Sequence, residues 1–188
     1  MRRKLIIFAC SATVLSVSTF SATAWDTPES YGFGRPPPSS EVTAWNITIM
    51  PDGTGLPPGR GTVAKGAATY STKCAACHGR TGSEGPFETL VGTKSLAEEI
   101  NAHEKPKRTI GNMWFSAPVL FDYVRRAMPF NDPGSLTTDE LYSLTGWLLY
   151  RNGLLKENQT VDAKTLSNVK MPASHIFVED PRRPWLVR

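Results

Sequence analysis

The sequence predicts an all-α fold, because three segments repeat apolar residues at helical spacing and no segment keeps the alternation of a strand. The three segments are residues 63–73, 116–127 and 137–151. The chain has 188 residues, of which 40% are hydrophobic and 20% charged, which suits one compact domain with extensions.

The segment 137–151 has the clearest helix signals. Thr137 and Glu140 form a capping box at its start, and Asn152-Gly153 supplies a stop at its end. Its leucines recur on one face, as in a helix that packs against a core. We therefore expect a long helix here.

The other two segments are shorter but carry helix signals of their own. Residues 116–127 begin with Ser116 as a cap and Pro118 in the first turn. Residues 63–73 place Val63 and Tyr70 on one face. Two weaker helices are expected, at residues 41–45 and 95–102.

The N-terminus is typical of a signal peptide. A basic start, Met1 to Lys4, precedes an uncharged apolar stretch, and small residues precede a cut after Ala24. An uncleaved membrane anchor is the alternative, but the apolar stretch is shorter than the roughly 20 residues of a span. We expect residues 1–24 to be removed on export, leaving a periplasmic protein with no membrane span.

Cleavage removes most of the chain's basic character. The formal net charge of the whole chain is +4; without the three basic residues of the signal, 18 Lys and Arg face 17 Asp and Glu, a net charge of +1. No basic block is interleaved with aromatic residues, so we expect no nucleic-acid partner.

Three regions follow the signal. Residues 25–61 hold seven prolines and six glycines but also aromatic and aliphatic anchors, which favours a strap packed on the domain over a solvated linker. Residues 62–153 hold the three main helical segments and form the predicted central domain. Residues 154–188 lack clear periodicity and are expected to form a C-terminal extension, a second strap.

The motif Cys74-Ala75-Ala76-Cys77-His78 predicts covalent attachment of haem c. Two thiols three residues apart can each form a thioether with a porphyrin vinyl group, and His78 then lies under the iron. A zinc site would need four ligands, and His103 and His175 complete that count without the usual spacing. A redox dithiol is expected in a βαβ context, which is absent here.

Met128 is the predicted second iron ligand. It ends a helical segment and precedes Pro129-Phe130, so that the proline stops the helix and frees the thioether. Methionine ligation raises the reduction potential and suits an electron carrier. Met171, His103 and His175 are the alternatives.

Other residues are expected to complete the pocket. The carbonyl of Pro86, or one near it, should accept the ring N–H of His78. Trp114 and Tyr123 are candidates for the pocket wall or for contact with a propionate, and core packing is the alternative for Trp114.

The motifs together resemble the class I cytochrome c family. The resemblance rests on C-A-A-C-H-G at 74–79, A-M-P-F at 127–130 and Gly146-Trp147 in the last helix of the domain. It implies three to four helices around one covalently bound haem, with Cys74, Cys77, His78 and Met128 as the haem-binding residues.

A closer resemblance extends into both straps. The segments 32–36, 51–59, 109–111, 120–130 and 162–166 are similar to the cytochrome c subunit of Sox-type sulfite dehydrogenases. This similarity implies a molybdenum sulfite dehydrogenase as electron donor and another cytochrome c or an oxidase as acceptor. That subunit often has a second haem domain, whereas this chain has one C-x-x-C-H.

The function expected from all this is one-electron transfer in the respiratory chain without catalysis by the chain itself. The alternatives are an electron-transfer subunit of another dehydrogenase, for alcohol or thiosulfate, and a catalytic haem enzyme. A cysteine-ligated catalytic haem would need a third mature cysteine, and a peroxidase would need an open iron position.

Overall fold

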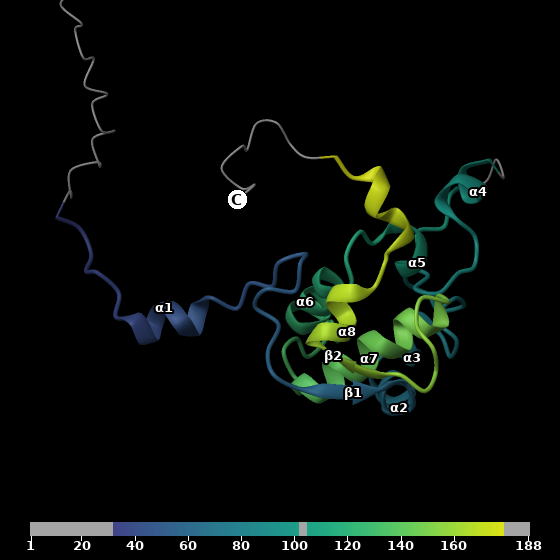
Figure 1. The fold of residues 1–188 in the computed structure, drawn as a ribbon. Helices are drawn as coiled ribbons and strands as arrows, with labels where there is room; N and C mark the ends of the chain where they lie inside the picture. Colours follow the sequence, from purple (N-terminus) through teal and green to yellow (C-terminus); the bar gives the residue numbers. More distant parts are fainter. Residues whose placement is uncertain (1–31, 102–104, 179–188) are drawn as a thin grey trace, which may run out of the picture. The chain divides into compact units, whose positions relative to one another are not determined.

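A computed structural model describes residues 32–101 and 105–178 of the chain. The chain divides into two compact units, residues 1–39 and 40–188, and the first is described only at 32–39, which has no regular structure before the first helix begins at Ser39. The helices and strands, shown in Figure 1, are α1 (Ser39–Trp45), β1 (Arg60–Thr62), α2 (Val63–Lys73), α3 (Ala75–His78), α4 (Leu96–Asn101), α5 (Ile110–Met113), α6 (Ala117–Ala127), α7 (Thr138–Arg151), β2 (Thr160–Asp162), α8 (Ala163–Asn168) and the 3-10 helix η1 (Pro172–Ile176).

The three predicted helices and the two weaker ones are present as α2, α6, α7, α1 and α4. The capping box of α7 is formed as expected: Glu140 N–H donates to Thr137 Oγ1 at 3.3 Å, and Thr137 N–H donates to Glu140 Oε2 at 2.8 Å. Ser116 occupies the N-cap position of α6 with a proline in the first turn. The all-α expectation is therefore confirmed.

The second unit is built around the crossing of α2 and α7. At Gly66 an added Cβ would overlap the Ser143 carbonyl and lie 2.7 Å from Trp147 Cβ, so only glycine lets the two backbones approach this closely. Next to it, the Tyr70 and Trp147 rings stack with centroids 4.0 Å apart. The first and last helices of the predicted domain therefore cross at Gly66 and Tyr70.

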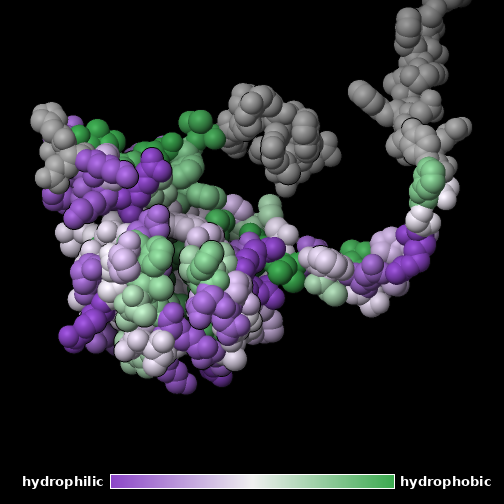
Figure 2. All heavy atoms as spheres, turned by 180° about the vertical axis from the view of Figure 1, so that it is seen from behind, coloured by the Kyte–Doolittle hydropathy of each residue, from purple (hydrophilic) through white to green (hydrophobic). Residues whose placement is uncertain are grey.

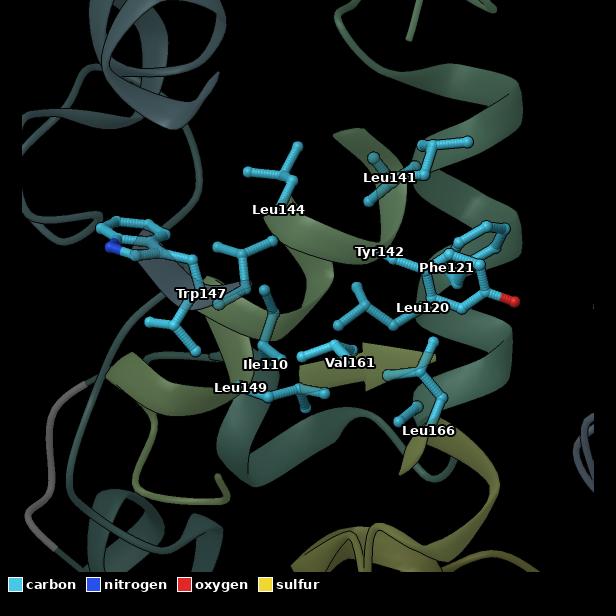
Figure 3. Packing of buried hydrophobic residues seen from close by; sticks show 14 of the residues in the cluster. Ile110, Leu120, Phe121, Leu141, Tyr142, Leu144, Trp147, Leu149, Val161 and Leu166 are labelled. Atoms are coloured by element: carbon cyan, nitrogen blue, oxygen red, sulfur yellow. The ribbon is translucent and has the colours of Figure 1, made fainter. Parts of the chain in front are cut away.

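Helix α6 covers another side of α7. Leu120 and Phe121 are at most 2% exposed, and the Phe121 ring meets Tyr142 of α7 with centroids 4.7 Å apart (Figure 3). Figure 3 also shows Val161 and Leu166, from the C-terminal region, among the same buried side chains. One hydrophobic core thus joins the helices to the chain that follows them.

A short strand pair closes this core and was not expected from the sequence. β1 and β2 are antiparallel, with Gly61 opposite Val161. Val161 is fully buried, and an added Cβ on Gly146 of α7 would lie 2.5 Å from its side chain. Strands of three residues are too short to show an alternating pattern, so they could not be predicted from the sequence.

The segment before β1 packs on the domain only in part. Ile49 is buried, and Arg126 Nη2 of α6 donates to the Ile47 carbonyl at 2.9 Å. Tyr142 Oη donates to the Pro57 carbonyl at 2.7 Å. Trp45 of α1, by contrast, is 82% exposed, so this predicted anchor does not pack on the domain.

The surface of the second unit is mixed in character. On the face seen in Figure 2, hydrophobic groups (green) lie between hydrophilic ones (purple). Within 32–101 and 105–178, no helix has both the length and the apolarity that a membrane crossing requires. The predicted signal peptide, residues 1–24, lies outside the described residues.

Candidate haem-attachment site

The structure brings Cys74, Cys77 and His78 together on one turn. Cys74 caps the C-terminus of α2, and the short helix α3 follows at once. The N–H groups of Cys77 and His78 both donate to the Cys74 carbonyl, at 3.1 and 3.0 Å. Cys74 is half-buried against the core, Cys77 is exposed, and both thiols are free. The motif residues therefore present two thiols and one imidazole from a single turn.

The loop after His78 folds back on this turn. Gly79 has φ +81°, and Tyr70 Oη donates to its carbonyl at 2.8 Å. Gly85 returns so close that an added Cβ would overlap the Cys77 carbonyl and the His78 carbonyl carbon. This path needs glycine at both positions, at Gly79 for its positive φ and at Gly85 for its close contact.

Glu84 holds the loop in shape. Its carboxylate accepts hydrogen bonds from the N–H groups of Thr81, at 2.8 Å, and Ser83, at 3.0 Å. The hydrogen bond from the Thr81 hydroxyl contributes most to lowering the pKa of Glu84, to about 2, and these backbone bonds add to it. Glu84 could not be recognised from the sequence, because a glutamate in a polar loop is usually only solvated.

His78 is oriented by a backbone carbonyl. Its Nδ1 lies 2.9 Å from the carbonyl oxygen of Glu88. We expected Pro86 or a residue near it as the acceptor, and the structure places it two residues further on. Because a carbonyl oxygen only accepts, Nδ1 carries the proton and Nε2 keeps its lone pair for a metal.

The chemistry of the cysteines argues against the two competing sites. Burial, above all other causes, raises the pKa of the Cys74 thiol to about 11, whereas a redox dithiol reacts as a thiolate near neutral pH. Among the described residues no group of three His, Cys, Asp or Glu side chains could hold a metal ion, so Cys74, Cys77 and His175 do not cluster. His103 lies outside the described residues.

Met128 lies at the end of α6, on a separate element from the cysteine turn. Its N–H donates to the Val124 carbonyl at 3.1 Å, its backbone is extended, and the peptide bond to Pro129 is cis. Its side chain is half-buried against the core. The alternative Met171, at 3% exposure, is sealed within the core instead.

The remaining predicted pocket residues form a pair. The Trp114 and Tyr123 rings meet at 5.3 Å between centroids, at an angle of 58°. Trp114 is half-buried against the core, and Tyr123 is 45% exposed. They therefore stand at the edge of the core, where either a pocket wall or simple packing accounts for them.

The site fits a covalently attached haem. Such a group needs two thiols with thioether reach and an imidazole whose Nε2 is free and whose ring is held from Nδ1. The turn 74–78 supplies all three, and the Glu88 carbonyl supplies the hold on Nδ1.

Comparisons with known proteins agree with this chemistry. A family model described as cytochrome C oxidase, cbb3-type, subunit III matches residues 61–148. No curated protein matches the chain significantly. Among solved structures, a chain of the sulfane dehydrogenase SoxCD from Paracoccus pantotrophus is similar, with a TM-score of 0.71 and 34% sequence identity. The match covers 83% of this chain and 75% of that chain.

The matched ranges place the chain in a family. The family model spans the cysteine turn, α6 and most of α7, and the SoxCD match confirms the resemblance to Sox-type cytochromes. Covalent haem c and a role in electron transfer follow from that kinship. The chain therefore belongs to the class I cytochrome c family.

Proposed function

We propose that this chain is a periplasmic cytochrome with one haem, which accepts electrons singly from a molybdenum sulfite dehydrogenase and passes them to the respiratory chain. The observation that carries the haem assignment is the hydrogen bond of 2.9 Å between His78 Nδ1 and the Glu88 carbonyl. It gives a histidine beside two free thiols the tautomer and fixed ring that an iron ligand needs.

Four residues would hold the haem. Cys74 and Cys77 would form the thioethers, and His78 Nε2 and the Met128 sulfur would bind the iron. When bound, haem c supplies a one-electron iron couple. The hydrogen bond to Glu88 makes the His78 ring a stronger donor, and a neutral thioether at Met128 raises the reduction potential. Neither residue takes or gives a proton, which suits a carrier rather than a catalyst.

Export is part of the proposal. Haem c is attached outside the cytoplasm, and residues 1–24 have the pattern of a signal peptide. The mature chain would have a net charge near zero and no membrane span, as a periplasmic carrier requires.

The donor has two candidates. The sequence resemblance favours a sulfite dehydrogenase. The similarity to a chain of the sulfane dehydrogenase SoxCD, at 34% identity, favours an enzyme that oxidises sulfane sulfur. Both donors would deliver electrons from a sulfur substrate to the same haem, so the site alone does not separate them.

Absorption spectra test the function. The oxidised protein is mixed with sulfite alone, with sulfite and a periplasmic sulfite dehydrogenase, and with a sulfane dehydrogenase and its substrate. We expect rapid haem reduction with the sulfite dehydrogenase and none with sulfite alone. Reduction only by the sulfane dehydrogenase would replace the donor. If the protein has a c-type spectrum but its haem is reduced in none of the three mixtures, both donors are excluded. If it has no c-type spectrum, the haem assignment is wrong.

A further inference from the structure

Asn152 makes more hydrogen bonds than the end of a helix requires. It follows α7 as the C-cap residue, and its side-chain Nδ2 donates to the Leu148 carbonyl at 2.8 Å. The same Nδ2 donates to the Leu90 carbonyl at 3.1 Å. Its Oδ1 accepts from the N–H groups of Gly92, at 3.2 Å, and Gly111, at 3.1 Å. Three of these four bonds leave α7 for other segments.

Two of these bonds hold the segment that carries Glu88. The Leu90 carbonyl also accepts a hydrogen bond from Ile110 N–H at 3.0 Å, so it is bonded by both Asn152 and α5. Leu90 N–H donates in turn to the Gly82 carbonyl at 2.7 Å. Asn152 is thus the one side chain described here that bonds the backbone on both sides of Val91.

Glu88 lies two residues before Leu90, and its carbonyl is the acceptor for His78 Nδ1. A backbone fixed at Leu90 and Gly92 leaves little freedom for a carbonyl so close along the chain. We propose that Asn152 is a positioning residue for His78, acting through the backbone of 88–92. This inference rests on the proposed function, because it assigns His78 to the iron.

The amide is the chemical group that this place requires. It donates twice and accepts twice, and Asn152 uses both capacities. Asn152→Asp would keep the two acceptor bonds and lose the two donor bonds. Asn152→Ala would lose all four. A helix stop alone would need only the bond to Leu148.

The test compares these variants with a control that weakens the same core elsewhere. Val161→Ala removes methyl groups from a fully buried side chain on β2, which has no hydrogen bond to 88–92 among the described residues. Each holoprotein is studied in the reduced state by NMR of the His78 ring N–H and by redox titration. Unfolding in denaturant gives the overall stability of each.

In Asn152→Ala, the His78 ring N–H should exchange with solvent about tenfold faster, the equivalent of one net hydrogen bond. The reduction potential should rise, because a ring held less firmly from Nδ1 is a weaker donor to oxidised iron. Asn152→Asp should also speed the exchange, because it loses the two donor bonds; its reduction potential is not compared, because the added negative charge lowers the potential by itself. Val161→Ala should lower stability and leave both haem signals unchanged.

Asn152 variants that lose stability but keep the wild-type exchange rate and potential would overturn the inference. So would equal changes in Val161→Ala. A wild-type protein without a haem spectrum would instead defeat the proposed function itself, so the two failures are distinguishable.

Discussion

The α2–α7 crossing and the loop at 79–92 are stabilised by different interactions. The crossing depends on apolar fit: Gly66 admits the α7 backbone, and Tyr70 stacks on Trp147. The loop depends on hydrogen bonds to backbone groups, and most of its side chains are exposed or half-buried. The crossing therefore sets most of the unfolding free energy, whereas the loop sets the orientation of His78.

The largest expected effect on stability is at the crossing. Gly66→Ala should lower the free energy of unfolding by about 2 kcal/mol, because the new Cβ overlaps the Ser143 carbonyl. Helix propensity alone predicts the opposite sign, a gain of about 0.5–1 kcal/mol. Denaturant unfolding measures the difference. Ala68→Gly, at an exposed position of the same helix, is the control and should lose about 1 kcal/mol. If Gly66→Ala proved as stable as the wild type, the close approach of α2 and α7 at Gly66 would be contradicted.

Met128→Ala tests the proposed iron ligand at the C-cap of α6. It should cost about 1 kcal/mol, because the side chain is half-buried, and leave the haem attached. The sulfur-to-iron absorption of the oxidised protein should disappear. Met171→Ala is the control: it removes a buried core methionine and should lower stability more while leaving that absorption in place. If the absorption instead persisted in Met128→Ala and disappeared in Met171→Ala, Met171 would be the iron ligand.

Tyr70 joins the two regions, and Tyr142 is its matched control. Each hydroxyl donates to one backbone carbonyl, of Gly79 at 2.8 Å and of Pro57 at 2.7 Å. Either change to Phe should cost about 1 kcal/mol. Only Tyr70→Phe should alter the haem NMR signals, because only Gly79 adjoins His78. Equal haem changes in both variants would contradict the separation of crossing and loop.

The smallest effect is the response of the loop to acid. The pKa of Glu84, about 2, lies below its usual value of 4.5, so the carboxylate stabilises the loop above pH 4.5 and loses this effect as the pH falls toward 2. Protection of the Thr81 and Ser83 amides against exchange, measured relative to an unprotected amide at the same pH, should therefore fall over this range in wild type. In Glu84→Gln this protection should already be low near neutral pH and change little with acid. A wild-type loop unaffected by acid would show that Glu84 does not hold it.

The sequence was informative where interactions are local. The capping box at Thr137 and Glu140, the proline in the first turn of α6 and the C-x-x-C-H spacing are all patterns within a few residues, and the helices and the cysteine turn follow from them. The acceptor for His78 was predicted at Pro86 or a residue near it; the structure has it at Glu88, and the exact residue could not be predicted because the loop's path depends on contacts far along the chain. From the sequence, Asn152 could be recognised only as the end of a helix, because its bonds to Leu90 and Gly92 span about 60 residues. Such partners leave no periodic pattern in a single sequence.

The most direct test of the central claim is the intact mass of the protein expressed with its own N-terminus and a haem-attachment system, measured after denaturation. We predict the mass of residues 25–188 plus one haem, which requires export, cleavage after Ala24 and thioether bonds at Cys74 and Cys77. A mass without haem, from cells that attach haem to a control cytochrome, would contradict the account.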